Sequence, residues 1–139
     1  MGHTTVTIKV ENYIDVATAS KSKAKRGKKI RTVIIPDALI DTGATHLCLP
    51  SRYIKQLGLV PYPKEVSAQT ASGFVMRKMY GGAWLTIQDR SEECSVIEIP
   101  DSVPALVGVI PLEGMDFIVD PVDQKLIGKH GAKRVSLMY

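Results

Sequence analysis

The sequence predicts a mainly β fold, a small and mostly antiparallel barrel or sandwich with one or two short helices. Strand patterns recur along the chain, glycine and proline separate them at short intervals, and helical periodicity is confined to short segments. The chain has 139 residues, and 45% of them are hydrophobic. That is enough to bury a core of its own, so we expect a single domain over residues 1–139.

Three strands are expected in the first part of the chain. Residues 4–10 alternate and are rich in β-branched side chains, and residues 30–35 form a second strand that Pro36 stops. Residues 38–40 are short and fully apolar, as in a strand that is buried on both faces. A lysine-rich segment, residues 20–31, separates the first two strands and is interpreted as a loop insertion.

The best helix candidate is the segment 51–59. Tyr53, Ile54 and Leu57 recur at helical spacing, and Gly58 is a plausible C-terminal cap. The remaining elements are strands and turns. They are a hairpin over 67–87 with its tip near 71–73 and a kink at 81–82, a turn at 88–91, a strand at 94–100, a short apolar strand at 105–108, one or two helical turns at 109–115, two strands around a turn at 120–123, and a C-terminal tail at 129–139.

The positive charge of the chain is concentrated in one place. The net charge is +4, but the segment from Lys21 to Arg31 carries seven basic residues and no acidic one. Such a run can bind phosphate backbones, so it is the only candidate for a nucleic-acid contact. No aromatic residue interleaves with the lysines, which argues against a stacking platform for single-stranded nucleic acid. The simpler interpretation is a solvated insertion, and a processing site is a further alternative.

Several classes of protein are not indicated. No apolar run approaches the ~20 residues that cross a bilayer, and the N-terminal segment has no apolar region of a secretory signal. We therefore expect a cytoplasmic location. Cys48 and Cys94 do not have the spacing of a zinc site, and His3, His46 and His130 lie far apart in the sequence. We expect no metal and no cofactor.

The most specific feature is the stretch ALIDTGATHLCLP, residues 38–50. An apolar run ends on Asp41, and a charge there costs free energy unless it is paired, hydrogen-bonded or used. Gly43 permits a sharp turn that presents backbone N–H groups to the carboxylate. A simple strand–turn junction explains this pattern, and so does an acid that is held, partly desolvated, at a binding surface.

This stretch resembles the active-site segment of the retropepsin-like aspartic proteases, the retroviral type and its bacterial relatives. Leu106, Val107 and Gly108 resemble the second hallmark of the family, which packs beneath the catalytic loop. The segment QTASGFVMR stands where the family has its flap, and LVGVIPLEGMDFIVDPVDQKLIG resembles the closing segment of bacterial members. The resemblance covers about residues 30–128 and implies a small closed antiparallel β-barrel of retropepsin type.

The resemblance also implies an activity and a set of site residues. The family hydrolyses peptide bonds with a water that is activated by two aspartates sharing one proton. Only one Asp-Thr-Gly occurs in this chain, so the pair must form across a homodimer. The implied catalytic residues are Asp41, Thr42 and Gly43. The implied residues for binding a peptide or protein substrate are Ala44, Thr45, Thr70, Ala71, Ser72 and Gly73.

Three residues near the two hallmark segments bear on activity and on the dimer, and two of them, Thr45 and Val109, depart from the pattern of retroviral members. Ala44 stands where pepsin-like enzymes tend to have a serine whose hydroxyl donates to the carboxylate, which leads us to expect activity at mildly acidic to near-neutral pH. Thr45 and Val109 replace an acidic residue and an arginine that pair near the dimer interface of retroviral members. A catalytically weak retropepsin-fold dimerisation or binding module is therefore the alternative. A binder of acidic partners, working through the basic segment, is the third hypothesis.

Overall fold

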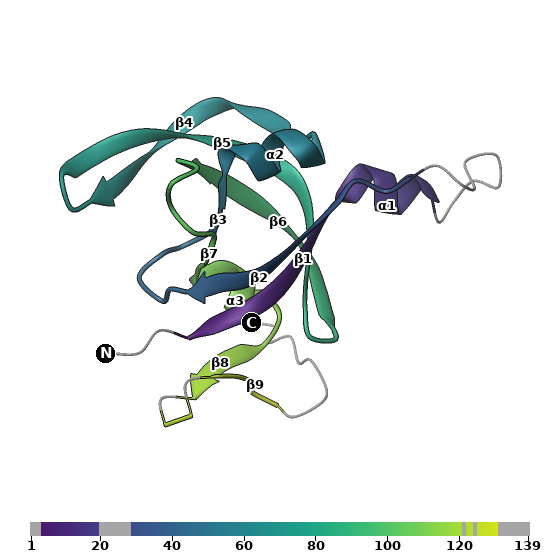
Figure 1. Ribbon diagram of the computed structural model, residues 1–139, viewed down its shortest axis with the longest axis vertical. Coiled ribbons are helices and arrows are strands. Elements are labelled where there is room, and N and C mark those ends of the chain that lie inside the picture. Colours follow the sequence, from purple (N-terminus) through teal and green to yellow (C-terminus); the bar gives the residue numbers. More distant parts are fainter. Residues whose placement is uncertain (1–3, 20–28, 121, 124, 131–139) are drawn as a thin grey trace, which may run out of the picture.

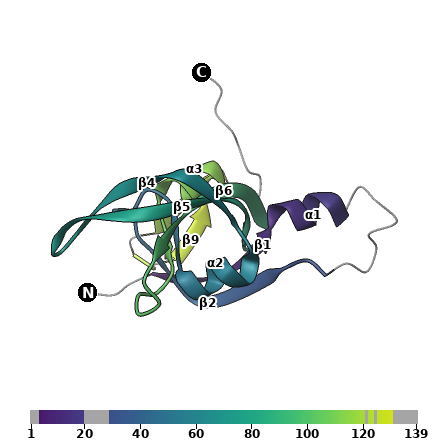
Figure 2. The ribbon, with the colours of Figure 1, turned by 90° about the horizontal axis from the view of Figure 1, so that it is seen from above.

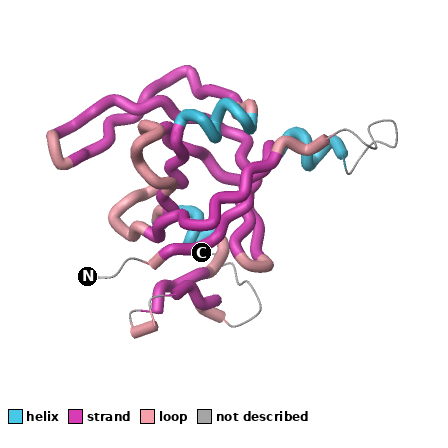
Figure 3. The backbone as a smooth tube through the Cα atoms, in the orientation of Figure 1, coloured by secondary structure: helices cyan, strands magenta, loops and turns pink. Residues whose placement is uncertain are grey.

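The computed structural model describes residues 4–19, 29–120, 122–123 and 125–130. Strands account for most of these residues, so the expected mainly β class is confirmed (Figure 3). In chain order the described elements are β1 (Thr5–Asn12), α1 (Tyr13–Ala19), β2 (Thr32–Ile40), β3 (Leu47–Pro50), α2 (Ser51–Leu57), β4 (Val60–Thr70), β5 (Gly73–Ile87), β6 (Arg90–Ile99), β7 (Leu106–Val107), α3 (Val109–Gly114), β8 (Phe117–Asp120) and β9 (Lys125–Gly128).

The main sheet curls back on itself. Its order is β1-β2-β7-β3-β6-β5-β4, and β1 also pairs with β5, so that a ring of pairings returns to β1. The outer parts of β4 and β5 continue beyond this ring as a long hairpin, and β8 and β9 form a separate pair below it (Figure 1). No helix among the described residues is long and apolar enough to span a membrane.

The sheet is mixed: most of its strand pairs are antiparallel, as expected, but two are parallel, which a wholly antiparallel barrel would not contain. β2 pairs with β7 in parallel, and β3 pairs with β6 in parallel. β7 also pairs with β3 in antiparallel fashion, so the two-residue strand β7 lies between β2 and β3. β2 and β3 are therefore not adjacent in the sheet, and the loop that joins them must span the width of β7, which comes much later in the chain.

The core has two parts. The larger part fills the interior of the ring, with fully buried residues such as Ile8, Leu47 and Leu85. The smaller part consists of Cys48, Met79, Ile97 and Ile99, with Val66, Val103 and Leu106 packed against it. Because these residues come from β3 to β7, the smaller part joins the base of the β4–β5 hairpin to the strands beneath it.

Most of the predicted elements are confirmed near their expected positions. The helix candidate is α2, and Gly58 follows it in the left-handed conformation with φ 61°. The hairpin turns between Thr70 and Gly73 as expected. The kink at 81–82 appears as a break in pairing register between Tyr80 and Ala83. The helical turns at 109–115 are α3, and the two strands around 120–123 are β8 and β9.

The prediction that Pro36 stops the second strand was wrong. β2 runs through Pro36, because the pairing with β1 shifts register between Val6 and Ile8 at this point. A bulge needs no ladder hydrogen bond from the proline, which has no N–H to give. The hydroxyl of Thr7 donates to the Pro36 carbonyl at 3.2 Å, which satisfies the acceptor that the bulge leaves over.

Two further differences concern strands, and two segments lie outside the described residues. β3 was not predicted, because it is only four residues long, all of them buried, and is too short for periodicity to reveal. β6 begins at Arg90 rather than near residue 94. Residues 20–28 of the basic segment and residues 131–139 of the tail lie outside the described residues, so the predictions for them stay predictions.

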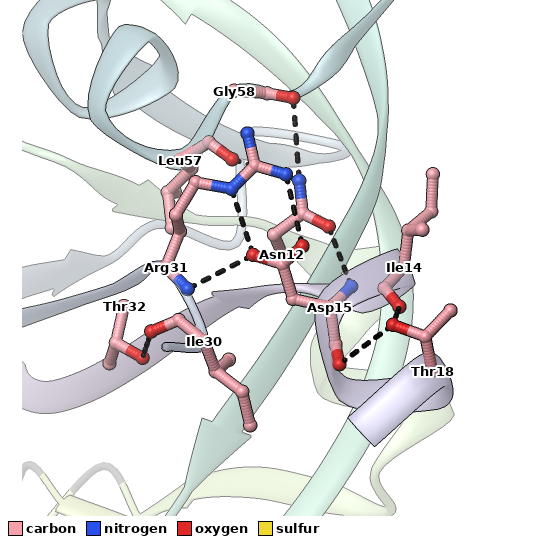
Figure 4. Close-up of polar contacts among 9 residues, drawn as sticks. All are labelled: Asn12, Ile14, Asp15, Thr18, Ile30, Arg31, Thr32, Leu57 and Gly58. Carbon is pink, nitrogen blue, oxygen red and sulfur yellow. Dashed lines mark hydrogen bonds and ion pairs between the residues drawn. The ribbon is translucent and has the colours of Figure 1, made fainter. Parts of the chain in front are cut away.

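The helix α1 was not predicted either, and a polar cluster anchors it to the rest of the fold (Figure 4). The side-chain oxygen of Asn12 accepts a hydrogen bond from the Asp15 N–H at 3.0 Å, as an N-terminal cap does. Its amide group donates to the carbonyls of Leu57 and Gly58 at 2.9 and 3.3 Å. The Asp15 carboxylate in turn accepts from the Arg31 guanidinium at 2.8 and 3.0 Å. The chain entering the basic segment is thereby tied to the chain leaving it.

We expect Asn12→Ala to destabilise the protein by about 2–3 kcal/mol, because it removes a cap and leaves two carbonyls without this donor. Asn12 is 2% exposed, so water cannot replace the lost hydrogen bonds in the intact fold. Asn12→Asp keeps the cap but turns a carboxylate towards the same two carbonyls. We therefore expect its free energy of unfolding to fall by at least as much. The measurement is urea unfolding, with Thr18→Ala as a control, because the Thr18 hydroxyl donates only to carbonyls of its own helix, those of Ile14 and Asp15. An Asn12→Ala variant as stable as the control would contradict this role.

Candidate active site

The loop from Asp41 to His46 leaves the end of β2 and folds tightly on itself. The backbone N–H of Asp41 donates to Val107 O at 3.0 Å, and the N–H of Ala44 donates back to Asp41 O at 3.0 Å. The N–H of Gly43 donates to the Asp41 carboxylate at 2.9 Å. The half-buried carboxylate is thus oriented by its own loop, as the pattern Asp-Thr-Gly predicts.

The backbone around Gly108 supports this loop from beneath. The N–H of Gly108 donates to His46 O at 3.1 Å, that of Val109 to Ala44 O at 2.9 Å, and that of Ile110 to Thr45 O at 2.9 Å. A methyl group on Gly108 would lie 2.6 Å from His46 O and 2.7 Å from Ala44 O. Only glycine allows the two chain segments to approach this closely.

The predicted site residues fall into two groups. Asp41, Thr42, Gly43, Ala44 and Thr45 share one loop, where Thr42, Gly43 and Thr45 are exposed and Ala44 is half-buried. The second group is the tip of the β4–β5 hairpin, residues 70–73. Seen from above, this hairpin reaches out on the same side of the ring as the loop that joins β2 to β3 (Figures 1 and 2).

The hairpin tip is organised by its own hydrogen bonds. The hydroxyl of Thr70 donates to Gly73 O at 2.9 Å and accepts from the Ser72 N–H at 3.3 Å. Ala71, Ser72 and Gly73 are exposed. Gly73 has φ 112°, which L side chains rarely adopt, so the turn depends on glycine at this position. The tip is therefore a defined turn, free to contact a ligand.

Two side chains next to the loop have perturbed acid–base properties. Burial lowers the pKa of His46, so its imidazole is neutral at pH 7, and its Nδ1 lies 2.8 Å from Thr45 Oγ1. The pKa of the Cys48 thiol is raised to about 11, first by burial and then by the negative charge of Asp41, while the positive charge of Arg77 opposes the rise. Neither group is set up as a nucleophile or its base.

Arg77 on β5 was not predicted as a site residue, but its positive charge acts on the Cys48 thiol, which follows this loop on β3. The signal was present, because Val75, Arg77 and Met79 alternate with exposed residues and therefore share one face of the hairpin. Within the described residues, no three histidine, cysteine, aspartate or glutamate side chains are grouped so that they could hold a metal ion.

Comparison with known proteins supports the interpretation of this loop. The family model described as aspartyl protease matches residues 14–120, which include the Asp41 loop, the β4–β5 hairpin and the segment at Gly108. The chain therefore belongs to the aspartyl protease family, of retropepsin-like type. A search of curated proteins found no match.

We expect Gly108→Ala to cost about 3 kcal/mol and to disrupt the Asp41 loop, because the new methyl group would collide with backbone atoms that cannot move independently. Gly114→Ala is the matched control. Its methyl group meets only the end of the flexible Glu92 side chain, and alanine is the better helix former at this end of α3. Chemical unfolding and cleavage assays measure the two effects. If Gly108→Ala and Gly114→Ala were equally stable, the role of Gly108 in supporting the Asp41 loop would be contradicted.

Both thiols should resist alkylation in the native protein. Burial raises the pKa of Cys94 to about 12 and that of Cys48 to about 11, so both remain protonated at pH 8. We expect iodoacetamide to react about a hundredfold more slowly than with a free thiol, and at the ordinary rate once the protein is unfolded in guanidinium. Mass spectrometry measures the modification, and fast labelling of the native protein would be the contrary result.

Proposed function

We propose that this chain is an aspartic endopeptidase that acts as a homodimer, with Asp41 from each of two copies forming the catalytic pair. One observation carries the proposal. The Asp41 carboxylate lies on a tight loop that is held by Gly43 and supported beneath by Gly108, in a chain of the aspartyl protease family. A single carboxylate of this kind does not make the shared-proton pair that such hydrolysis uses, which is why a second copy is part of the proposal.

The proposed reaction needs one proton between two carboxylates. The ionised Asp41 accepts a proton from a water molecule while the water oxygen attacks the carbonyl carbon of the scissile peptide bond. The protonated Asp41 of the other copy donates its proton to the carbonyl oxygen, which gives a neutral tetrahedral diol. The Asp41 that took the proton from water then gives it to the peptide nitrogen, and the C–N bond breaks while one hydroxyl of the diol gives its proton to the other Asp41. The products are a carboxylic acid and an amine, and the pair again holds one proton.

The fold supports this proposal in two ways. The ring of pairings that returns to β1 is what a closed barrel of retropepsin type would show, and closure leaves few free strand edges. The β4–β5 hairpin projects on the side of the Asp41 loop, where it would cover a bound peptide as a flap (Figure 2). We propose that Thr70, Ala71, Ser72 and Gly73 contact the substrate from above, and Ala44 and Thr45 from the loop.

The second candidate is a retropepsin-fold dimerisation or binding module with weak catalysis. It is favoured by Thr45 and Val109, which replace the ion pair near the dimer interface of retroviral members. In this structure both positions are engaged within the loop, because the Val109 N–H donates to Ala44 O and the Thr45 hydroxyl lies against His46. Without that ion pair, a weaker dimer is expected.

The first test compares the wild type with Asp41→Asn on a diverse peptide library from pH 4 to 8. We expect cleavage by the wild type at mildly acidic to near-neutral pH, and a loss of about a thousandfold or more in the variant, because asparagine cannot transfer the proton. Mass spectrometry identifies the cut sites. No cleavage by the wild type at concentrations where sedimentation shows a dimer would overturn the enzyme in favour of the binding module.

Mixing the two proteins tests whether two copies share one site. If they do, random exchange of equal amounts leaves about a quarter of the dimers with two intact Asp41 residues, whereas independent sites would leave half of the activity. Relative to the same total amount of wild type, we expect about a quarter of the activity once exchange is complete, which is about half of the value at the moment of mixing. Activity that stays at the value seen at the moment of mixing would show that each chain works alone.

A further inference from the structure

Arg77 lies on the face of the β4–β5 hairpin that carries the smaller core. Along β5, Phe74 and Met76 are 75% and 59% exposed, whereas Val75 and Arg77 are half-buried and Met79 is buried. Because side chains alternate along a strand, Arg77 points to the same side as Met79. Met79 packs in the smaller core with Cys48, so Arg77 belongs to the inner face of the hairpin.

The pairing register connects this face to the Asp41 loop. Met79 is opposite Ile97, Ile97 is opposite Cys48, and Cys48 is opposite Leu106, which gives one row of side chains across four strands. Cys48 follows the Asp41 loop directly on β3. The charges of Asp41 and Arg77 both act on the Cys48 thiol, in opposite directions, so both lie within electrostatic range of the same buried group.

Arg77 has no ion-pair partner among the residues that the structure describes. Arg31 pairs with Asp15, Arg52 with Asp101, and Arg90 with Asp116. Facing Arg77 on β4 is Val66, which offers no charge. A half-buried guanidinium without a carboxylate has donors to spare, and it would gain a charge-assisted hydrogen bond from an acid that a ligand brings.

We propose that Arg77 is a specificity-determining residue that selects peptides with an aspartate or glutamate side chain close to the cleaved bond. The inference rests on the proposed protease function, because it places the peptide between the hairpin and the Asp41 loop. A planar guanidinium can hold a carboxylate through two parallel hydrogen bonds, which an amide of the same shape cannot match. The discrimination should therefore be strongest between glutamate and glutamine.

The test uses pairs of peptides that differ only by glutamate or glutamine at each position around an established cut. We expect the wild type to favour the glutamate peptide about tenfold in kcat/KM at the best position, and Arg77→Met to lose this preference. Arg77→Glu should favour a lysine peptide instead. The matched control is Lys78→Met, which removes a neighbouring positive charge on the exposed outer face and should keep the tenfold preference.

Binding separates this inference from the proposed function. Fluorescence anisotropy of labelled peptides on Asp41→Asn, with and without Arg77→Met, measures the glutamate-over-glutamine ratio without any cleavage. The inference is supported if Arg77→Met abolishes the preference for binding the glutamate peptide and Lys78→Met preserves it. This holds even if the wild type cuts nothing and the protease proposal fails. If Asp41→Asn binds the glutamate and glutamine peptides equally well, the inference is overturned. Cleavage of both peptides that depends on Asp41 would still leave the protease proposal intact. Thermal unfolding of Arg77→Met shows whether the variant is folded, and Arg77→Glu gives a reversal that misfolding cannot produce.

Discussion

The contact on which the site depends is the set of three backbone hydrogen bonds between Gly108–Ile110 and Ala44–His46. They join a loop near residue 44 to a segment more than sixty positions later in the sequence. Because the partners are main-chain groups, side-chain identity enters mainly through Gly108, whose lack of a side chain allows the approach. The orientation of Asp41 is thereby coupled to the pairing of β7 between β2 and β3.

This arrangement explains why the sheet must be mixed. A loop that rests on a later strand needs β2 and β3 to separate, and β7 can fill the gap only by running parallel to one neighbour and antiparallel to the other. The same separation brings Cys48 and Leu106 opposite each other, so the floor beneath the hairpin is formed by residues that adjoin the two hallmark segments. The contacts of β7 with β2 and β3 therefore determine both the sheet order and the position of the Asp41 loop.

The sequence predicted those parts of the structure that local chemistry determines. The Asp41 turn, the Gly58 cap and the Thr70–Gly73 turn follow from residues whose backbone or hydrogen-bonding preferences are strong. It failed where the determinant lies elsewhere in the fold. Pro36 is tolerated because β1 shifts register beside it, which no pattern around Pro36 reveals.

The missed helix α1 and the missed Arg77 have different causes. α1 has no buried residue, so it lacks the apolar stripe that periodicity detects, and only the spacing of Asn12 and Asp15 indicated a cap. Arg77 was visible in the alternation along β5, but its importance depends on Cys48 and Asp41 being near in space. Distances between strands cannot be read from one strand's pattern.

The polar cluster of Asn12, Asp15 and Arg31 has a consequence for how this fold can vary. The cluster holds the chain in place on both sides of the basic segment, so changes within the segment are not transmitted to the sheet that carries the Asp41 loop. The entropic penalty of a longer closed loop is small, about 0.6 kcal/mol for each doubling of its length. Insertions, deletions or a change of charge between α1 and β2 can therefore accumulate in evolution with little effect on the geometry around Asp41. This part of the fold is a natural place to acquire an added function.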